Sequence, residues 1–176
     1  RKTEDDKKQY LEELKDIRVN WEKTSGIEHI LKKHINPLKE NKFIIFCDKI
    51  SHIQEMELEV QKWFLKAFKD YNRTVYKIFS GNADNNYKIL EEFKNHNRDK
   101  NIDLLFSVDM LNEGIHIDSV SGVILLRQTA SNRIYLQQIG RCLCSGDKVK
   151  SPLIFDLVNN FNALNDGLDF KAQFEL

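Results

Sequence analysis

The chain has few of the residues that interrupt or cross-link a polypeptide. Its 176 residues include 2 prolines, 7 glycines and 3 cysteines, so we expect it to be dense in helices and strands. The cysteines, Cys47, Cys142 and Cys144, form neither an even set nor a C-x-x-C pair. This excludes a disulfide framework, argues against a metal site and favours a reducing, cytosolic compartment.

An excess of charge is also missing. The 27 basic and 27 acidic side chains balance, which excludes a polybasic nucleic-acid binder and leaves only local patches for contact with a polyanion. There is no run of 18 apolar residues and no signal peptide, so no membrane contact is expected. The histidines never adopt H-x-x-x-H or H-E-x-x-H spacing, and no metal site is expected from them.

Two nucleotide-binding signatures are absent as well. The sequence holds no G-x-x-x-x-G-K-[ST] loop for a triphosphate and no D-E-x-[DH] segment for magnesium, and Gly146-Asp147-Lys148 has the wrong spacing. The chain begins at Arg1 rather than Met, and we expect it to be a piece of a longer protein.

What is present is an alternation of short apolar runs and helical patterns. Strands are predicted at 43–47, 74–79, 102–108, 122–126 and 153–158. Between them lie a helix opened by a capping box at Ser51–Gln54, a helix carrying Tyr87, Leu90 and Phe93, and a helix at 131–144. This order predicts βαβ units, hence a three-layer α/β/α fold with a mostly parallel sheet.

Three regions are expected along the chain. Residues 1–40 form a helical extension or inter-domain linker, in which Ser25-Gly26-Ile27-Glu28 has the form of a capping box. Residues 41–160 form the α/β domain, and residues 161–176 form a tail.

Polar residues follow the predicted strands, at the sheet edge where open α/β folds bind ligands. The segments at this edge are Cys47-Asp48, Ser80-Gly81, Ser107-Val108-Asp109, Arg127-Gln128-Thr129 and Val158-Asn159.

The helix at 131–144 carries the most specific pattern, Gln137-Gln138-Ile139-Gly140-Arg141. Gln137 and Arg141 lie four residues apart and share one face, and Gly140 disfavours a helix unless something approaches its backbone closely. An amide and a permanent guanidinium on one face suit a phosphate chain. The alternative is an ordinary surface helix, with Leu136, Ile139 and Leu143 in the core.

These motifs resemble those of a known family. The Q-x-x-G-R of Gln137–Arg141, following the D-x-L-x-E-G of Asp109–Gly114, resembles motifs VI and V of superfamily 2 helicases. The run from Phe43 to Met56 resembles motif IV, and Arg127–Ser131 resembles the segment before motif VI in helicases related to restriction-enzyme motor subunits. Residues 40–160 as a whole look like the second, C-terminal RecA-like domain of these enzymes.

The resemblance implies an ATP-driven nucleic-acid motor, with DNA expected rather than RNA. Arg141 then corresponds to an arginine finger directed at the γ-phosphate, and Gln137 to the polar residue that orients phosphate or water. ATP and Mg²⁺ would be held mainly by an N-terminal RecA-like domain of the same polypeptide, so this piece alone would not hydrolyse ATP. The remaining implied contacts are Glu113, Gly114 and Gly140 to ATP, and Ser80, Gly81, Ser107, Asp109 and Thr129 to nucleic acid.

Three positions depart from the family pattern. Cys144 occupies the place of a second arginine, His116 that of an aspartate, and Val108 that of a phosphate-binding threonine. They leave open a degenerate, non-catalytic scaffold that binds protein or nucleic acid. A flavodoxin-like domain that binds a small phosphorylated ligand is a further alternative, supported by sheet topology alone.

Overall fold

A computed structural model describes residues 26–39, 41–81, 83–109, 117, 120–129, 132–143 and 153–160. Residues 1–25 of the expected helical extension, the tail at 161–176, and the positions Glu113, Gly114, His116 and Cys144 lie outside this part. Within it, no helix is long and apolar enough to cross a bilayer.

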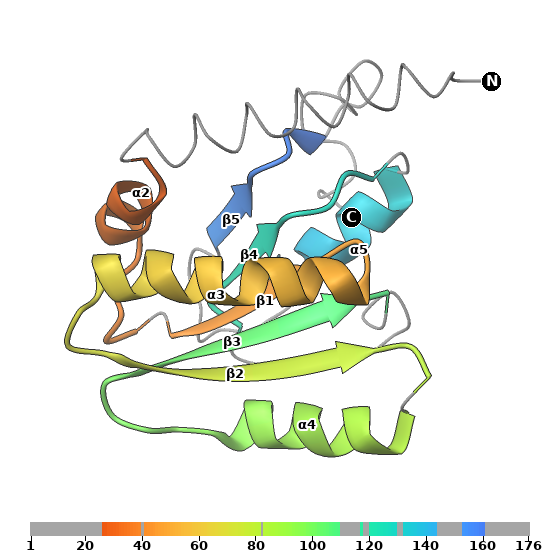
Figure 1. The fold of residues 1–176 in the computed structure, drawn as a ribbon, viewed down its shortest axis with the longest axis horizontal. Helices are drawn as coiled ribbons and strands as arrows, with labels where there is room; N and C mark the ends of the chain where they lie inside the picture. The colour runs from red at the N-terminus through yellow and green to blue at the C-terminus, as the bar shows by residue number, and fades with distance from the viewer. Residues whose placement is uncertain are drawn as a thin grey trace.

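The core of the fold is a five-stranded, all-parallel sheet in the order β2-β3-β1-β4-β5 (Figure 1). Every predicted strand is confirmed, with its ends within a residue or two of the expected positions. The strands are β1 Lys42–Phe46, β2 Asn72–Phe79, β3 Asn101–Val108, β4 Gly122–Leu125 and β5 Leu153–Asp156. The central strands β1 and β3 are buried along their whole length, as their continuous apolar runs predict.

Helices cover both faces of the sheet. On one face, α2 (Ile27–His34) and α3 (Ile50–Ala67) bury side chains such as Leu31, Val60 and Phe64 against β1 and β3. On the other, α4 (Ala83–Asn95) and α5 (Asn132–Leu143) bury side chains such as Phe93, Tyr135 and Ile139. The three-layer α/β/α prediction is therefore confirmed, and α2, which falls in the expected extension, contributes to the core.

The expected capping box of α3 is wrong. Lys49 is the N-cap and makes no side-chain cap bond, because Ser51 already lies inside the first turn. His52 acts at the helix start instead: its Nδ1 accepts a hydrogen bond from the backbone N–H of Asp48 at 3.3 Å. At α2 the N-cap is Gly26, again without a side-chain bond.

The inward face of α4 also differs from the expectation. Tyr87 is 68% exposed, while Asn86 is buried together with Leu90 and Phe93. Asn86 can occupy the inward position because its Nδ2 donates to the carbonyl oxygen of Phe79 at 2.8 Å.

A polar network closes the edge of the sheet where the strands begin. The buried Lys42 Nζ donates to the carbonyl oxygens of Phe93 and Lys94, both at 2.6 Å, and so caps the end of α4. Burial lowers the pKa of Lys42, and the nearby Asp103 opposes this. Asp103 accepts from Asn101 and contacts His96, each at 2.7 Å, while burial raises its pKa.

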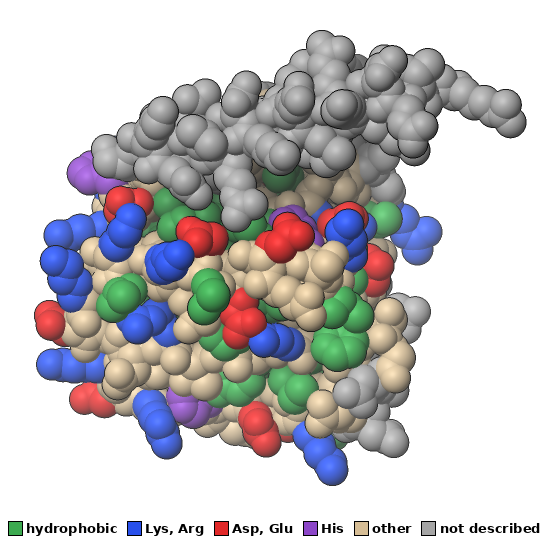
Figure 2. Space-filling model, viewed as in Figure 1, with side chains coloured by type: hydrophobic (Ala, Val, Ile, Leu, Met, Phe, Trp, Pro, Cys, Tyr) green, Lys and Arg blue, Asp and Glu red, His purple; other side chains and the backbone are tan. Residues whose placement is uncertain are grey.

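The surface mixes charges. Acidic and basic side chains alternate over the face that carries α3, and no patch of one sign dominates it (Figure 2). This agrees with the balanced charge of the sequence.

Candidate functional site

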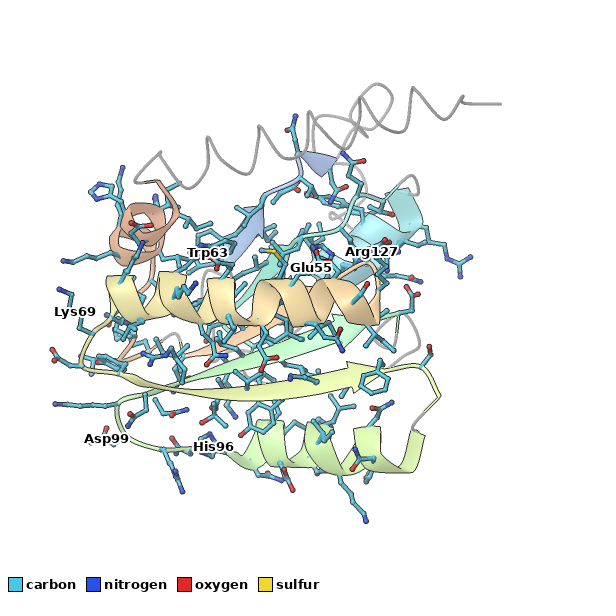
Figure 3. All side chains as sticks on the ribbon, in the orientation of Figure 1. Glu55, Trp63, Lys69, His96, Asp99 and Arg127 are labelled. Atoms are coloured by element: carbon cyan, nitrogen blue, oxygen red, sulfur yellow. The ribbon has the colours of Figure 1, made fainter. Side chains whose placement is uncertain are left out.

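The candidate site lies at the edge where the parallel strands end. Arg127 lies at this edge, whereas His96 and Asp99 lie where the strands begin (Figure 3). Two residues that leave strands here adopt positive φ, Asp109 at 55° after β3 and Asn159 at 60° after β5. Asp and Asn tolerate this left-handed conformation better than most residues, so each strand can turn sharply where it ends.

An ion pair joins two strand ends that are not neighbours. Phe46 of β1 lies in register with Ser107 of β3 on one side and Leu125 of β4 on the other. Two residues further along, the Arg127 Nη1 donates to the Asp109 Oδ1 at 2.5 Å. Because β1 separates these strands, their backbones are about 10 Å apart, two strand spacings. The pair therefore spans the carboxyl end of β1.

The turn after β4 is held from the opposite side as well. The buried Asn160 accepts from the backbone N–H of Thr129 at 2.9 Å and donates to the carbonyl oxygen of Arg127 at 3.0 Å. A single side-chain amide thus satisfies both backbone groups, as a neighbouring peptide would. The turn that leads into α5 is fixed by Asp109 on one side and Asn160 on the other.

The two faces of α5 differ in what they carry. Tyr135, Gln138 and Ile139 are buried toward the sheet, whereas Arg133 is exposed and Gln137 is half-buried. Arg141 lies one turn after Gln137, so its backbone position belongs to the same outward face. The side chain of Arg141 lies outside the described part of the structure.

Gly140 has no close neighbour among the described residues outside its own helix. A Cβ built on Gly140 meets nothing within 4 Å, in contrast to Gly122, where it would lie 2.7 Å from the carbonyl oxygen of Leu153. Close packing therefore explains the glycine in β4 but not the glycine in α5. The close approach expected at Gly140 does not come from the described part of this chain.

The family comparison identifies this arrangement. The model of the helicase conserved C-terminal domain matches residues 25–146, well over half of the chain. The chain belongs to this helicase C-terminal domain family. The match includes α2 and extends through α5.

Two relatives and two solved structures agree with this assignment. The chain is 26% identical over 137 residues to the type I restriction enzyme EcoKI endonuclease subunit of Escherichia coli (strain K12), covering 76% of this chain and 12% of that protein. It is 23% identical over 146 residues to the ATP-dependent RNA helicase DBP6 of Candida albicans (strain SC5314 / ATCC MYA-2876), covering 77% of this chain and 23% of that protein.

Among the structures, the C-terminal part of the Fun30 ATPase domain has a TM-score of 0.53 at 18% identity, covering 73% of this chain and 38% of that one. Domain 2 of the DEAD-box helicase Mss116p, bound to an RNA duplex, has a TM-score of 0.53 at 20% identity, covering 74% and 48%. These likenesses confirm the RecA-like α/β fold. The chain spans a quarter or less of the length of either relative.

The predicted nucleic-acid contacts of this helicase domain differ in how far they are exposed. Ser80 and Gly81 are exposed in the turn after β2, where Gly81 has a φ of 96°. Ser107 is completely buried and Thr129 is 7% exposed, so these side chains do not reach the surface. Asp109 is exposed, but its carboxylate is held by Arg127. The turn after β2 is thus the most accessible of the predicted contacts.

Sequence reasoning missed the residues that hold the site together. Arg127 and Thr129 were singled out as parts of a motif, but neither the Arg127–Asp109 pair nor the role of Asn160 was expected. The register of β1 with β3 and β4 would have indicated the Arg127–Asp109 pair, had the strand order been known. No sequence signal pointed to Asn160.

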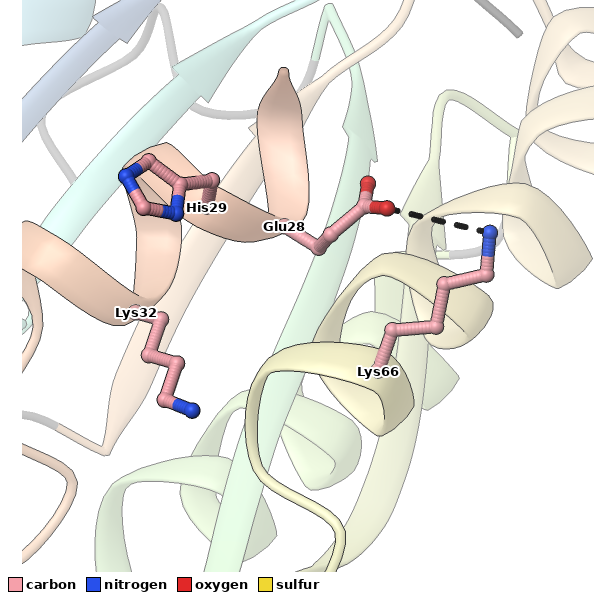
Figure 4. A pocket seen from close by; sticks show the side chains of 4 residues that line it. All are labelled: Glu28, His29, Lys32 and Lys66. Atoms are coloured by element: carbon pink, nitrogen blue, oxygen red, sulfur yellow. Dashed lines mark ion pairs between the residues drawn. The ribbon is translucent and has the colours of Figure 1, made fainter. Parts of the chain in front are cut away.

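One hollow on the surface lies away from this edge of the sheet. It has a volume of about 420 Å³, lies between α2 and α3 and is lined by Glu28, His29, Lys32 and Lys66 (Figure 4). Glu28 and Lys66 are 3.9 Å apart across it. It belongs to neither α5 nor the strand-end turns. Among the described residues, no cluster of His, Cys, Asp and Glu is suited to a metal ion.

Proposed function

We propose that this helicase C-terminal domain is one half of an ATP-driven nucleic-acid helicase or translocase, with DNA as the expected substrate. A second RecA-like domain of the same polypeptide would hold ATP and Mg²⁺. Support comes from the family and the fold, and from the absence of a P-loop sequence in this chain. The domain alone is then inactive as an ATPase.

The single observation that carries the catalytic part is the outward face of α5. It presents Gln137 and the position of Arg141, beside a glycine whose added Cβ would meet no described residue within 4 Å. A planar guanidinium that is always charged can stabilise the charge that spreads over a transferring phosphoryl group. In related phosphoryl-transfer systems an arginine finger is worth roughly 10³–10⁵ in rate. We assign this role to Arg141 and the orientation of phosphate or water to Gln137.

The remaining contacts follow from the position of each segment. Glu113, Gly114 and Gly140 would face ATP when the two domains close. The exposed Ser80-Gly81 turn offers a hydroxyl and backbone N–H groups to a nucleic-acid phosphate. ATP would close the domains and hydrolysis would reopen them, which is a ligand-driven shift between two domain arrangements.

One observation favours a second candidate, a degenerate scaffold without catalysis. Val108, in the place of a phosphate-binding threonine, is 6% exposed and packs in the core, so the end of β3 offers no hydroxyl there. Cys144 and His116 are two further positions at which the polar or charged residue of the family pattern is replaced, and they support the same alternative.

The deciding experiment is Arg141→Ala in the full-length protein. Nucleic-acid-stimulated ATP turnover should fall by roughly 10³-fold or more, while ATP binding changes little, because the finger acts on the transition state. Arg98→Ala, at an exposed arginine on the opposite edge of the sheet, is the matched control and should resemble wild type. Unchanged turnover in Arg141→Ala would refute the finger assignment, and a wild-type protein without ATP turnover would favour the scaffold.

A further inference from the structure

The ion pair between Asp109 and Arg127 joins the two segments that matter most to the proposed function. Asp109 is the first residue of the Asp109–Gly114 segment, and Arg127 is the first residue of the turn that leads into α5. These segments leave strands β3 and β4, which are separated by β1. Within the described part of the structure, this is the ion pair that spans β1 to tie one of these segments to the other.

The ion pair between Asp109 and Arg127 holds two segments in position more than it stabilises the fold. The side chain of Arg127 is 13% exposed, but that of Asp109 is 54% exposed, and an ion pair open to water contributes little to folding. Arg127 is also fixed through its own backbone, because Asn160 binds its carbonyl oxygen. A displacement of Asp109 is therefore transmitted to Arg127, at the beginning of the turn that leads into α5.

We propose that Asp109 and Arg127 are positioning residues that couple nucleic-acid binding to ATP turnover. The inference rests on the proposed function. When nucleic acid shifts the segment that begins at Asp109, the pair moves the turn at 127–129 and with it α5, which carries Gln137 and Arg141. Thermodynamic linkage requires the reverse effect too, so nucleotide must change the affinity for nucleic acid by the same factor that nucleic acid changes the affinity for nucleotide.

The test is a double-mutant cycle in the full-length protein, with Asp109→Asn, Arg127→Gln and the double variant. Asparagine suits the left-handed backbone at position 109. The measured quantity is the ratio of ATP turnover with saturating single-stranded DNA to turnover without it. Each single variant should lower this ratio about 5- to 10-fold, the lower part of the usual coupling range. The double variant should be no worse than either single one, because both remove the same contact.

A second readout separates coupling from direct binding. The affinity for single-stranded DNA is measured with and without a non-hydrolysable ATP analogue. The ratio of these two affinities should be closer to one in all three variants than in wild type. If instead Arg127 binds a phosphate directly, Arg127→Gln weakens DNA binding without nucleotide while Asp109→Asn strengthens it, since one removes a positive and the other a negative charge. Opposite effects of this kind would overturn the proposal, as would additive losses in the cycle.

The matched control is the ion pair of Lys77 with Glu57, which joins β2 to α3 at 2.6 Å. Lys77→Gln and Glu57→Gln should leave the ratio as in wild type. Thermal unfolding is followed in every variant, and Arg127→Met, which also removes the contact, replaces Arg127→Gln if the latter does not fold. Wild-type protein without DNA-stimulated turnover would overturn the proposed function and this proposal together, whereas stimulated wild type with an additive cycle overturns the pair alone.

Discussion

Gly140→Ala separates stability from activity in a way that few substitutions do. Gly140 lies inside α5, where glycine costs roughly 0.5–1 kcal/mol relative to alanine. No described residue lies within 4 Å of the added Cβ, so no steric penalty from this part of the chain offsets the gain. We expect the variant to be more stable by about that amount, which raises the unfolding midpoint of a domain of this size by about 1–4 °C.

The same change should damage the full-length protein. If the open space beside Gly140 receives the nucleotide or the partner domain, a methyl group there displaces the outward face of α5. Misplacement of catalytic groups by about 1 Å can cost on the order of 100-fold in rate. We therefore expect Gly140→Ala to lower nucleic-acid-stimulated ATP turnover by roughly 10- to 100-fold, although its domain is more stable than that of wild type.

Two measurements and one control check this reasoning. Thermal unfolding of the 176-residue chain is followed by circular dichroism, and ATP turnover is measured in the full-length protein. Gly122→Ala should instead destabilise the domain, because its Cβ would lie 2.7 Å from the carbonyl oxygen of Leu153. The reasoning fails if Gly140→Ala lowers the midpoint, or if it leaves turnover at the wild-type level.

Two further predictions concern the interior. Burial, assisted by the charge of Asp48, raises the pKa of the Cys47 thiol from 9.0 to about 12. The folded state then keeps a proton that the unfolded state loses. The contribution of Cys47 to the free energy of unfolding is therefore intact below pH 9 and falls by about 1.4 kcal/mol per pH unit as the pH rises toward 12. In urea unfolding, Cys47→Ala should lose stability less steeply with rising pH than wild type does, and an equally steep loss would contradict the assignment. Lys42→Met should lower the free energy of unfolding in urea by about 2 kcal/mol, because it leaves the carbonyl oxygens of Phe93 and Lys94 without their donor. Lys62→Met, at an exposed lysine, is the control, and an equal loss in the two variants would argue against the role of Lys42 as a cap.

Local pattern was enough to predict most of the fold. The runs that became β1 and β3 are apolar throughout because both faces of a central parallel strand are covered. Ile53, Val60 and Phe64 likewise recur at helical spacing in the sequence, and all three are buried on the inner face of α3. The position of Gln137 opposite the core side of α5 followed from the same periodicity.

Features decided by a single distant partner were not predictable. Asn86 replaces Tyr87 on the inner side of α4 because one carbonyl oxygen of β2 needs a donor. The partners Asp109 and Arg127 are 18 residues apart, and Asn160 lies 31 residues from Thr129. A motif identifies which residues belong to the site, whereas such contacts depend on the order of the strands in the sheet.

The central place of β1 has a consequence for the order of folding. Its two partners, β3 and β4, begin at Asn101 and Gly122, so the strand emerges from the ribosome long before either. Until then its apolar residues and both hydrogen-bonding edges stay unpaired, which is the state most prone to aggregation. β1 cannot be paired on both of its edges until about residue 125 has been made, and folding through such distant contacts is slow. A nascent chain stalled before that point should therefore need a chaperone more than the finished domain does.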